Sequence, residues 1–105
     1  MREKERYALK VQGIVQGVGF RPFIYTLATQ HHLSGWVLNS GLGVVIEIEG
    51  SPSDCAGFLA DLPIKAPALS RIDNMDMQQI DPKDEDSFVI LPSLNSPKNT
   101  LIPRI

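Results

Sequence analysis

The sequence predicts an α+β domain of the ferredoxin-like type, a βαββαβ sandwich in which two helices cover one face of a mostly antiparallel sheet. Segments with an apolar residue at every second position alternate, in that order, with segments of helical spacing, and a short extra strand follows. Turns rich in glycine, proline and asparagine separate the segments. The chain has 105 residues, of which 43% are hydrophobic, so we expect one core and one domain.

The first segments predict a strand, a glycine loop and a helix. Residues 1–6 are a charged start that we expect to be frayed, and from Tyr7 the side chains alternate between apolar and polar, as in a half-buried strand. Pro22 suits the first position of a helix, where its missing N–H has no partner in any case. Gly35 is expected to end the helical pattern. The stripe of this helix that faces the core contains Phe23, Ile24, Leu27, Ala28 and His31.

A hairpin and a second helix come next. The apolar run 36–38 and the alternating residues 44–49 predict two strands, and residues 39–43 have the composition of a turn. Ser51 and Pro52 are typical of the N-cap and the first position of a helix. The residues of this helix that face the core are Cys55, Phe58, Leu59 and Leu62.

The last third of the sequence has weaker patterns. Residues 63–67 predict a connection, and residues 72–80 predict a strand of imperfect phase, because its two methionines fall on the face opposite its two isoleucines. A β-bulge and a later strand start would each explain this phase, and the residues leave both open. The run PKDED predicts a solvated turn, and a short strand over 87–91 completes a domain of residues 7–91. Residues 92–105 predict a linker or disordered tail.

The composition argues against several classes of function. The formal net charge is −2, so a general surface for nucleic acid or anionic membrane is not expected. The single cysteine cannot form an intramolecular disulfide, and no set of His, Cys and acidic residues has metal-ligand spacing, so we predict no metal and no cofactor. The start of the chain is too charged for a signal peptide and no apolar run reaches about 18 residues, which predicts a cytoplasmic protein.

An isolated arginine at the end of the glycine loop is the strongest indication of function. Arg21 is the only Lys or Arg between Val11 and Ile64, and Gly17 and Gly19 precede it. Such glycines allow backbone N–H groups to converge on an anion at a helix N-terminus, and a guanidinium adds donors that match phosphate oxygens. The spacing differs from Walker A and dinucleotide-binding motifs. The residues alone leave open a simple tight turn with a solvated arginine.

Two segments resemble the sequence signatures of the acylphosphatase family. GIVQGVGFR at 13–21 and GWVLNSGLG at 35–43 are separated by a helix-length gap, and the resemblance covers about residues 7–91. FRPF and APALSRID resemble, more narrowly, the acylphosphatase-like N-terminal domain of hydrogenase maturation carbamoyltransferases. In those longer proteins a linker similar to NTLIP leads into a cysteine-rich zinc module. We therefore expect this chain to be an excised or truncated domain.

The resemblance implies hydrolysis of acyl phosphates, with carbamoyl phosphate as the substrate and inorganic phosphate as a product. It implies that the Arg21 guanidinium stabilises the phosphoryl group and that the Asn39 side chain holds the attacking water. Phosphoryl transfer needs mainly positioning and charge stabilisation, which agrees with the absence of Asp and Cys from residues 11–50. In the longer proteins the implied partners are downstream zinc-finger-like and carbamoyl-transfer domains. The implied phosphate cradle is formed by the backbone N–H groups of Gln16, Gly17, Val18, Gly19, Phe20 and Arg21.

The residues allow other interpretations of function. The chain could be a stand-alone general acylphosphatase, or a module of the same fold that binds an anion without turnover. An RNA-binding sheet is disfavoured, because it needs paired aromatic residues and basic edges that these strands lack. Asn39 has a structural interpretation as a turn residue. His31 and Cys55 are interpreted as packed helix residues, and neither is expected to act in catalysis.

Overall fold

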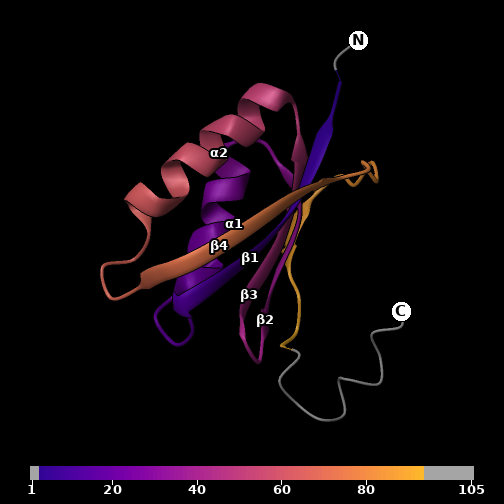
Figure 1. Ribbon diagram of the computed structural model, residues 1–105. Coiled ribbons are helices and arrows are strands. Elements are labelled where there is room, and N and C mark those ends of the chain that lie inside the picture. The colour runs from indigo at the N-terminus through magenta and orange to yellow at the C-terminus, as the bar shows by residue number, and fades with distance from the viewer. Residues whose placement is uncertain (1–2, 94–105) are drawn as a thin grey trace.

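The structure, a computed structural model, describes residues 3–93 and confirms the predicted fold class (Figure 1). The strand order in the sheet is β4-β1-β3-β2-β5, and every neighbouring pair is antiparallel except β2 and β5. Both helices lie on one face of this sheet, as Figure 1 shows. The elements are β1 (Glu5–Ile14), α1 (Phe20–Gln30), β2 (Ser34–Ser40), β3 (Gly43–Gly50), α2 (Pro52–Lys65), β4 (Arg71–Ile80) and β5 (Phe88–Ile90).

Strand β1 begins earlier than predicted, and the expectation that residues 1–6 are frayed throughout is wrong for its last members. Arg6 is fully buried on the open face of the sheet, away from the helices. Its guanidinium lies 2.7 Å from a carboxylate oxygen of Glu47, 2.9 Å from Glu49 and 3.1 Å from Glu85. The sequence pattern does not reveal the burial of Arg6, because a run of charged residues at the start of a chain is typical of a solvated terminus.

The acidic run PKDED is more ordered than the predicted solvated turn. Its residues are mostly exposed, but the Glu49 carboxylate accepts hydrogen bonds from the backbone N–H groups of Lys83 at 2.8 Å and Asp84 at 2.9 Å. These bonds hold the segment against the open face of the sheet. Burial alone would raise the pKa of Glu49, but these N–H groups and the Arg6 guanidinium lower it below its ordinary value.

Helix α1 begins before Pro22, which occupies its first turn and not its first position. Proline is tolerated there because the N–H groups of the first turn have no intrahelical acceptor. The helix ends at Gln30, and the predicted stop, Gly35, lies inside β2. The predicted apolar stripe is confirmed for its central residues. The buried residues of α1 are Phe20, Ile24, Leu27 and Ala28.

The hairpin is tighter than predicted. Strand β2 continues to Ser40, which pairs with Gly43, so only Gly41 and Leu42 connect the two strands. The prediction that residues 39–43 form the turn is therefore wrong for Asn39, which pairs with Val44 in the ladder. Strand pairing gives this side chain a fixed direction that a turn residue would lack.

Helix α2 confirms the predicted cap and core residues, although Leu59 is only partly buried, and it extends beyond the predicted end. The Ser51 hydroxyl accepts a hydrogen bond from the Asp54 backbone N–H at 3.2 Å, and Cys55, Phe58 and Leu62 are buried. The helix continues through Pro63 to Lys65. The helix tolerates a proline in its last turn because only one hydrogen bond is lost there. The predicted connection over 63–67 therefore begins too early.

A β-bulge explains the phase of β4. Gln12 pairs with Asn74 and Gly13 pairs with Ile72, so Asp73 is an extra residue opposite β1. The bulge moves the two methionines onto the same face as Ile72, toward the helices, and leaves Ile80 opposite Arg6 on the open face. Of the two explanations that the sequence left open, the bulge is therefore the right one.

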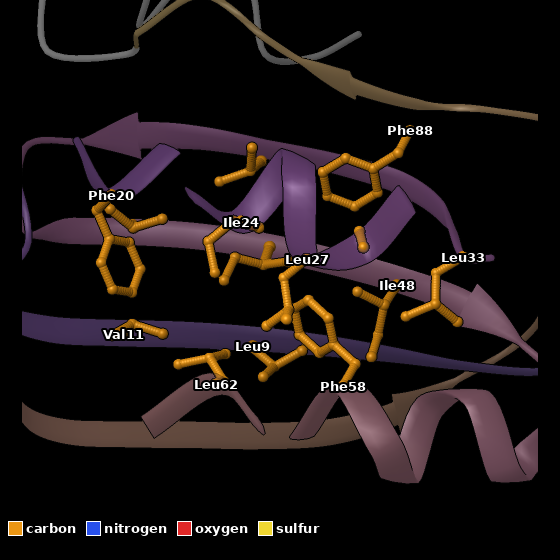
Figure 2. Packing of buried hydrophobic residues seen from close by; sticks show 14 of the residues in the cluster. Leu9, Val11, Phe20, Ile24, Leu27, Leu33, Ile48, Phe58, Leu62 and Phe88 are labelled. Atoms are coloured by element: carbon orange, nitrogen blue, oxygen red, sulfur yellow. The ribbon is translucent and has the colours of Figure 1, made fainter. Parts of the chain in front are cut away.

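The hydrophobic core lies between the sheet and the two helices (Figure 2). Figure 2 shows Phe20, Ile24 and Leu27 from α1 and Phe58 and Leu62 from α2 packed around Leu9 and Val11 of β1. Full burial of each such side chain contributes about 1.5–3 kcal/mol. This packing fixes the start of α1, and with it the end of the glycine loop, on the sheet. Neither described helix is long and apolar enough to cross a membrane.

Candidate active site

The glycine loop joins the end of β1 to the start of α1 and is anchored at both ends. Val15 is 2% exposed and Phe20 is 1% exposed, whereas Gly17 and Gly19 between them are exposed. The backbone φ angles of these glycines are 75° and 81°, in the left-handed region. A β-carbon at either glycine would contact no atom within 4 Å. The glycines are therefore required by the backbone conformation and not by lack of space.

The loop presents backbone donors without acceptors. The N–H groups of residues 16–21 make no hydrogen bond to any residue in the described range 3–93. Gly19 is the N-cap of α1 and provides no side-chain cap, and the first turn of the helix contains no acidic residue. Free backbone donors thus lie next to the positive end of the helix dipole, an arrangement that favours the binding of an anion.

Arg21 adds a full positive charge to this place. Its side chain is partly exposed and forms no ion pair or hydrogen bond with the described part of the chain. The other two arginines of residues 3–93 are both paired, Arg6 with glutamates and Arg71 with Asp73. A guanidinium with no protein partner, beside free N–H groups, is available to an external anion.

Asn39 supplies a polar atom that lacks a partner. The residue is 9% exposed, and its side-chain oxygen Oδ1 is buried without a hydrogen bond to the residues that the structure describes. Asn39 lies two positions after the fully buried Val37 on β2, so both side chains point to the helix side of the sheet. A buried acceptor without a donor costs about 1–3 kcal/mol, and a bound water would satisfy it.

The Gln16 side chain brings the loop and the Asn39 strand together. Its Nε2 donates to the backbone carbonyl oxygen of Ser40 at 2.7 Å and to that of Gly43 at 3.0 Å. The predicted cradle residues therefore lie beside the end of β2. The sequence motif indicates only the backbone N–H of Gln16 as a group of the site. Its side-chain contact has no periodic signal, because the partners are more than 20 residues away along the chain.

A shallow hollow of about 210 Å³ lies between the loop and the hairpin turn. Ile14 is 46% exposed and Leu42 is 74% exposed, so its rim has apolar side chains. A larger hollow of about 460 Å³ lies near Phe88 and Glu85 at the other end of α1, away from the glycine loop. The volume of a hollow therefore does not identify the candidate site, whereas the unpaired N–H groups of the glycine loop do.

Cys55, His31 and Asp61 take part in structural contacts away from the glycine loop. Burial raises the pKa of the Cys55 thiol to about 11, so it stays protonated in the core. His31 confirms its interpretation as a packing residue, because its Nε2 lies 2.9 Å from the Asp61 carboxylate of α2. This hydrogen bond, with that of Lys65, lowers the pKa of Asp61. No group of three His, Cys, Asp or Glu side chains within residues 3–93 is arranged to hold a metal ion.

The family model of acylphosphatases matches residues 7–90. This chain belongs to the acylphosphatase family. The acylphosphatase of Leuconostoc mesenteroides is 46% identical over 66 residues, which are 62% of this chain and 73% of that protein. The residues that the family model matches include both the glycine loop and the strand of Asn39.

Longer proteins contain the same domain. The probable carbamoyltransferase HypF of Methanocaldococcus jannaschii is 48% identical over 94 residues, which are 89% of this chain but 12% of that protein. The crystal structure of a full-length HypF in the phosphate- and nucleotide-bound form has a TM-score of 0.86 and 34% identity, again over 89% of this chain and 12% of the other. This chain thus corresponds to a small part of the HypF proteins that it matches.

Proposed function

We propose that this domain hydrolyses acyl phosphates at the glycine loop and that its substrate is carbamoyl phosphate. The observation that carries the proposal is the combination of unpaired groups at one end of the sheet. They are the free N–H groups of residues 16–21, the Arg21 guanidinium and the Asn39 Oδ1 atom. Membership of the acylphosphatase family supports the reaction, and similarity to HypF carbamoyltransferases supports the carbamoyl group.

In this proposal the loop binds the phosphoryl group. The N–H groups of Gln16 to Phe20 and of Arg21 donate to phosphoryl oxygens, and the guanidinium donates a fork of hydrogen bonds to the same oxygens. The left-handed glycines hold the N–H groups in place before the substrate arrives. Because charge on the phosphoryl oxygens changes during transfer, preorganised donors stabilise the transition state without reorganisation.

The attacking water binds at Asn39. It donates one hydrogen bond to the unpaired Oδ1, and its oxygen then faces the phosphorus atom opposite the leaving group. The new bond joins the water oxygen to phosphorus, and the bond from phosphorus to the acyl oxygen breaks. The acyl group leaves as carbamate, and the proton of the water passes to a phosphoryl oxygen. No protein base is required, since the mixed anhydride has a good leaving group.

The proposal extends to the longer protein. We place the domain in a HypF-type carbamoyltransferase of hydrogenase maturation, where carbamate would pass to downstream zinc-finger-like and carbamoyl-transfer domains. The bound phosphate in the full-length HypF structure supports phosphate as a ligand of that protein. We also place the protein in the cytoplasm, where a single buried thiol such as Cys55 stays reduced.

Two other functions are tested by the same assay. The chain covers 73% of a stand-alone acylphosphatase, which favours a general hydrolase as the second candidate. A module that binds phosphate without turnover is the third. The assay measures phosphate release from carbamoyl phosphate and from benzoyl phosphate by the wild-type chain, Arg21→Ala and Asn39→Ala. Lys10→Ala and Asn74→Ala are matched controls, because both side chains lie on the open face of the sheet.

Each candidate predicts a different result. Turnover that Arg21→Ala and Asn39→Ala lose and the controls keep supports an acylphosphatase site, and a preference for carbamoyl phosphate supports the HypF assignment. Equal rates on the two substrates favour the general hydrolase. Absence of turnover, with phosphate binding that depends on Arg21, refutes the hydrolase and leaves the binding module.

A further inference from the structure

The Gln16 side chain is the one polar side chain within the loop segment 15–19. Both hydrogens of its amide group have acceptors, the backbone oxygens of Ser40 at 2.7 Å and Gly43 at 3.0 Å. These two residues form the last pair of the β2–β3 ladder. The side chain therefore spans the gap between the glycine loop and the tip of the hairpin.

The hairpin tip, residues 40–43, is held in place by its own hydrogen bonds and by contact with β1. The Ser40 hydroxyl donates to the Gly43 oxygen at 3.3 Å and accepts from the Leu42 backbone N–H at 3.3 Å. The backbone at Gly43 also lies directly against β1, since a β-carbon there would be 2.3 Å from the carbonyl oxygen of Val11. These contacts fix the carbonyl oxygens of Ser40 and Gly43, so the hydrogen bonds from Gln16 can hold the loop in one position.

We propose that the Gln16 side chain is a positioning residue that sets the distance between the bound phosphoryl group and the water at Asn39. The inference rests on the proposed function. Ser40 follows Asn39 directly, and neighbouring Cα atoms are about 3.8 Å apart. The hydrogen bond to Ser40 thus ties the loop that binds phosphate to the residue beside the one that holds the water.

The geometry separates this role from phosphate binding. The amide hydrogens of Gln16 are occupied by carbonyl oxygens, so the side chain does not donate to the phosphoryl group. Loss of the tie leaves the loop glycines, the free N–H groups and Arg21 in the chain. Phosphate therefore still binds, but the water and the phosphorus atom lose their alignment, and a displacement of about 1 Å in such an arrangement lowers rates about a hundredfold.

The first test separates rate from binding. Gln16→Ala should lower kcat for carbamoyl phosphate about tenfold or more, while the inhibition constant of inorganic phosphate changes less than about threefold. Gln30→Ala, at the exposed end of α1, is the matched control and should change neither quantity. Thermal unfolding of each variant shows that the compared proteins are folded.

The second test uses pH. In Gln16→Glu the new carboxylate faces two carbonyl oxygens and cannot donate, whereas its protonated form can donate one hydrogen bond. The pKa of a carboxyl that donates only when protonated is raised. The rate of Gln16→Glu relative to wild type should therefore increase as the pH falls from about 7 to about 5, and the relative rate of Gln16→Ala should stay constant.

The possible outcomes distinguish the two proposals. An active wild type with Gln16 variants of unchanged kcat overturns the positioning role and leaves the proposed function intact. Equal losses in kcat and in phosphate affinity also overturn it, because they would assign Gln16 to the formation of the loop. An inactive wild type overturns both proposals together.

Discussion

Substitution of Arg6 should destabilise the protein more than any other change of a single charge, although the residue lies away from the candidate active site. Arg6 is fully buried, and its guanidinium nitrogens lie 2.7, 2.9 and 3.1 Å from oxygens of Glu47, Glu49 and Glu85. At such distances and an effective dielectric constant of about 20, each pair attracts by about 5–6 kcal/mol before the cost of desolvation. Removal of one partner from a buried cluster costs about 3–5 kcal/mol.

We therefore expect Arg6→Met to lose about 3–5 kcal/mol of unfolding free energy, out of a total of about 5–15 kcal/mol for a domain of this kind. Unfolding in urea can be followed by the fluorescence of Trp36, the single tryptophan, which lies beside the segment of Asp84 and Glu85. Lys10→Met is the matched control, since Lys10 lies on the same strand and the same face but is exposed. It should change the free energy by less than about 0.5 kcal/mol.

The pH dependence tests the cause of the loss. The pKa of Glu49 is lowered in the folded protein, so its stabilising effect is complete above the unfolded pKa of about 4.3 and is lost as the pH falls through the folded value. A protonated glutamate carries no charge, so its burial without Arg6 costs less free energy. The difference between wild type and Arg6→Met should therefore be largest at pH 7 and decrease toward pH 3. A difference below about 1 kcal/mol, or one that is constant over this range, would show that the buried ion pairs of Arg6 do not stabilise the fold.

Two further predictions concern the loop. Arg21→Ala should lower kcat/KM about a hundredfold or more, since charged hydrogen bonds contribute about 1.5–3 kcal/mol each. Arg21→Lys should lower kcat/KM less, because its point charge restores the attraction but not the paired hydrogen bonds of the guanidinium. Equal activity of the two variants in a phosphate-release assay would argue against phosphate recognition by this side chain. Gly19→Ala should lose about 1–2 kcal/mol in urea unfolding, because its φ of 81° is unfavourable for a residue with a β-carbon. Gly41→Ala should be neutral in the same experiment, since Gly41 has no positive φ and open space around it; equal losses would contradict the role of left-handed backbone.

Features that depend on neighbouring residues could be predicted from the amino-acid sequence. Alternation along Val44, Ile46 and Ile48 predicted β3, and the Ser51 cap predicted the start of α2; both are confirmed. The glycines before Arg21 indicated either an anion-binding loop or a simple tight turn, and the structure finds them in left-handed conformations with their N–H groups free. Such signals are local, because caps, periodicity and glycine backbone angles involve residues a few positions apart. The roles of Arg21 and Asn39 came from a resemblance to a family and remain proposals.

Features that join distant parts of the chain could not be predicted from the sequence and are seen only in the folded protein. The burial of Arg6 depends on glutamates more than 40 residues away, and the bulge at Asp73 depends on pairing with β1. The tie from Gln16 to the hairpin and the unpaired Oδ1 of Asn39 likewise arise where the loop and β2 meet. A linear pattern shows which side chains are polar, but not which acceptors the fold brings within hydrogen-bond distance. Those contacts depend on strand order and register, which are properties of the assembled sheet.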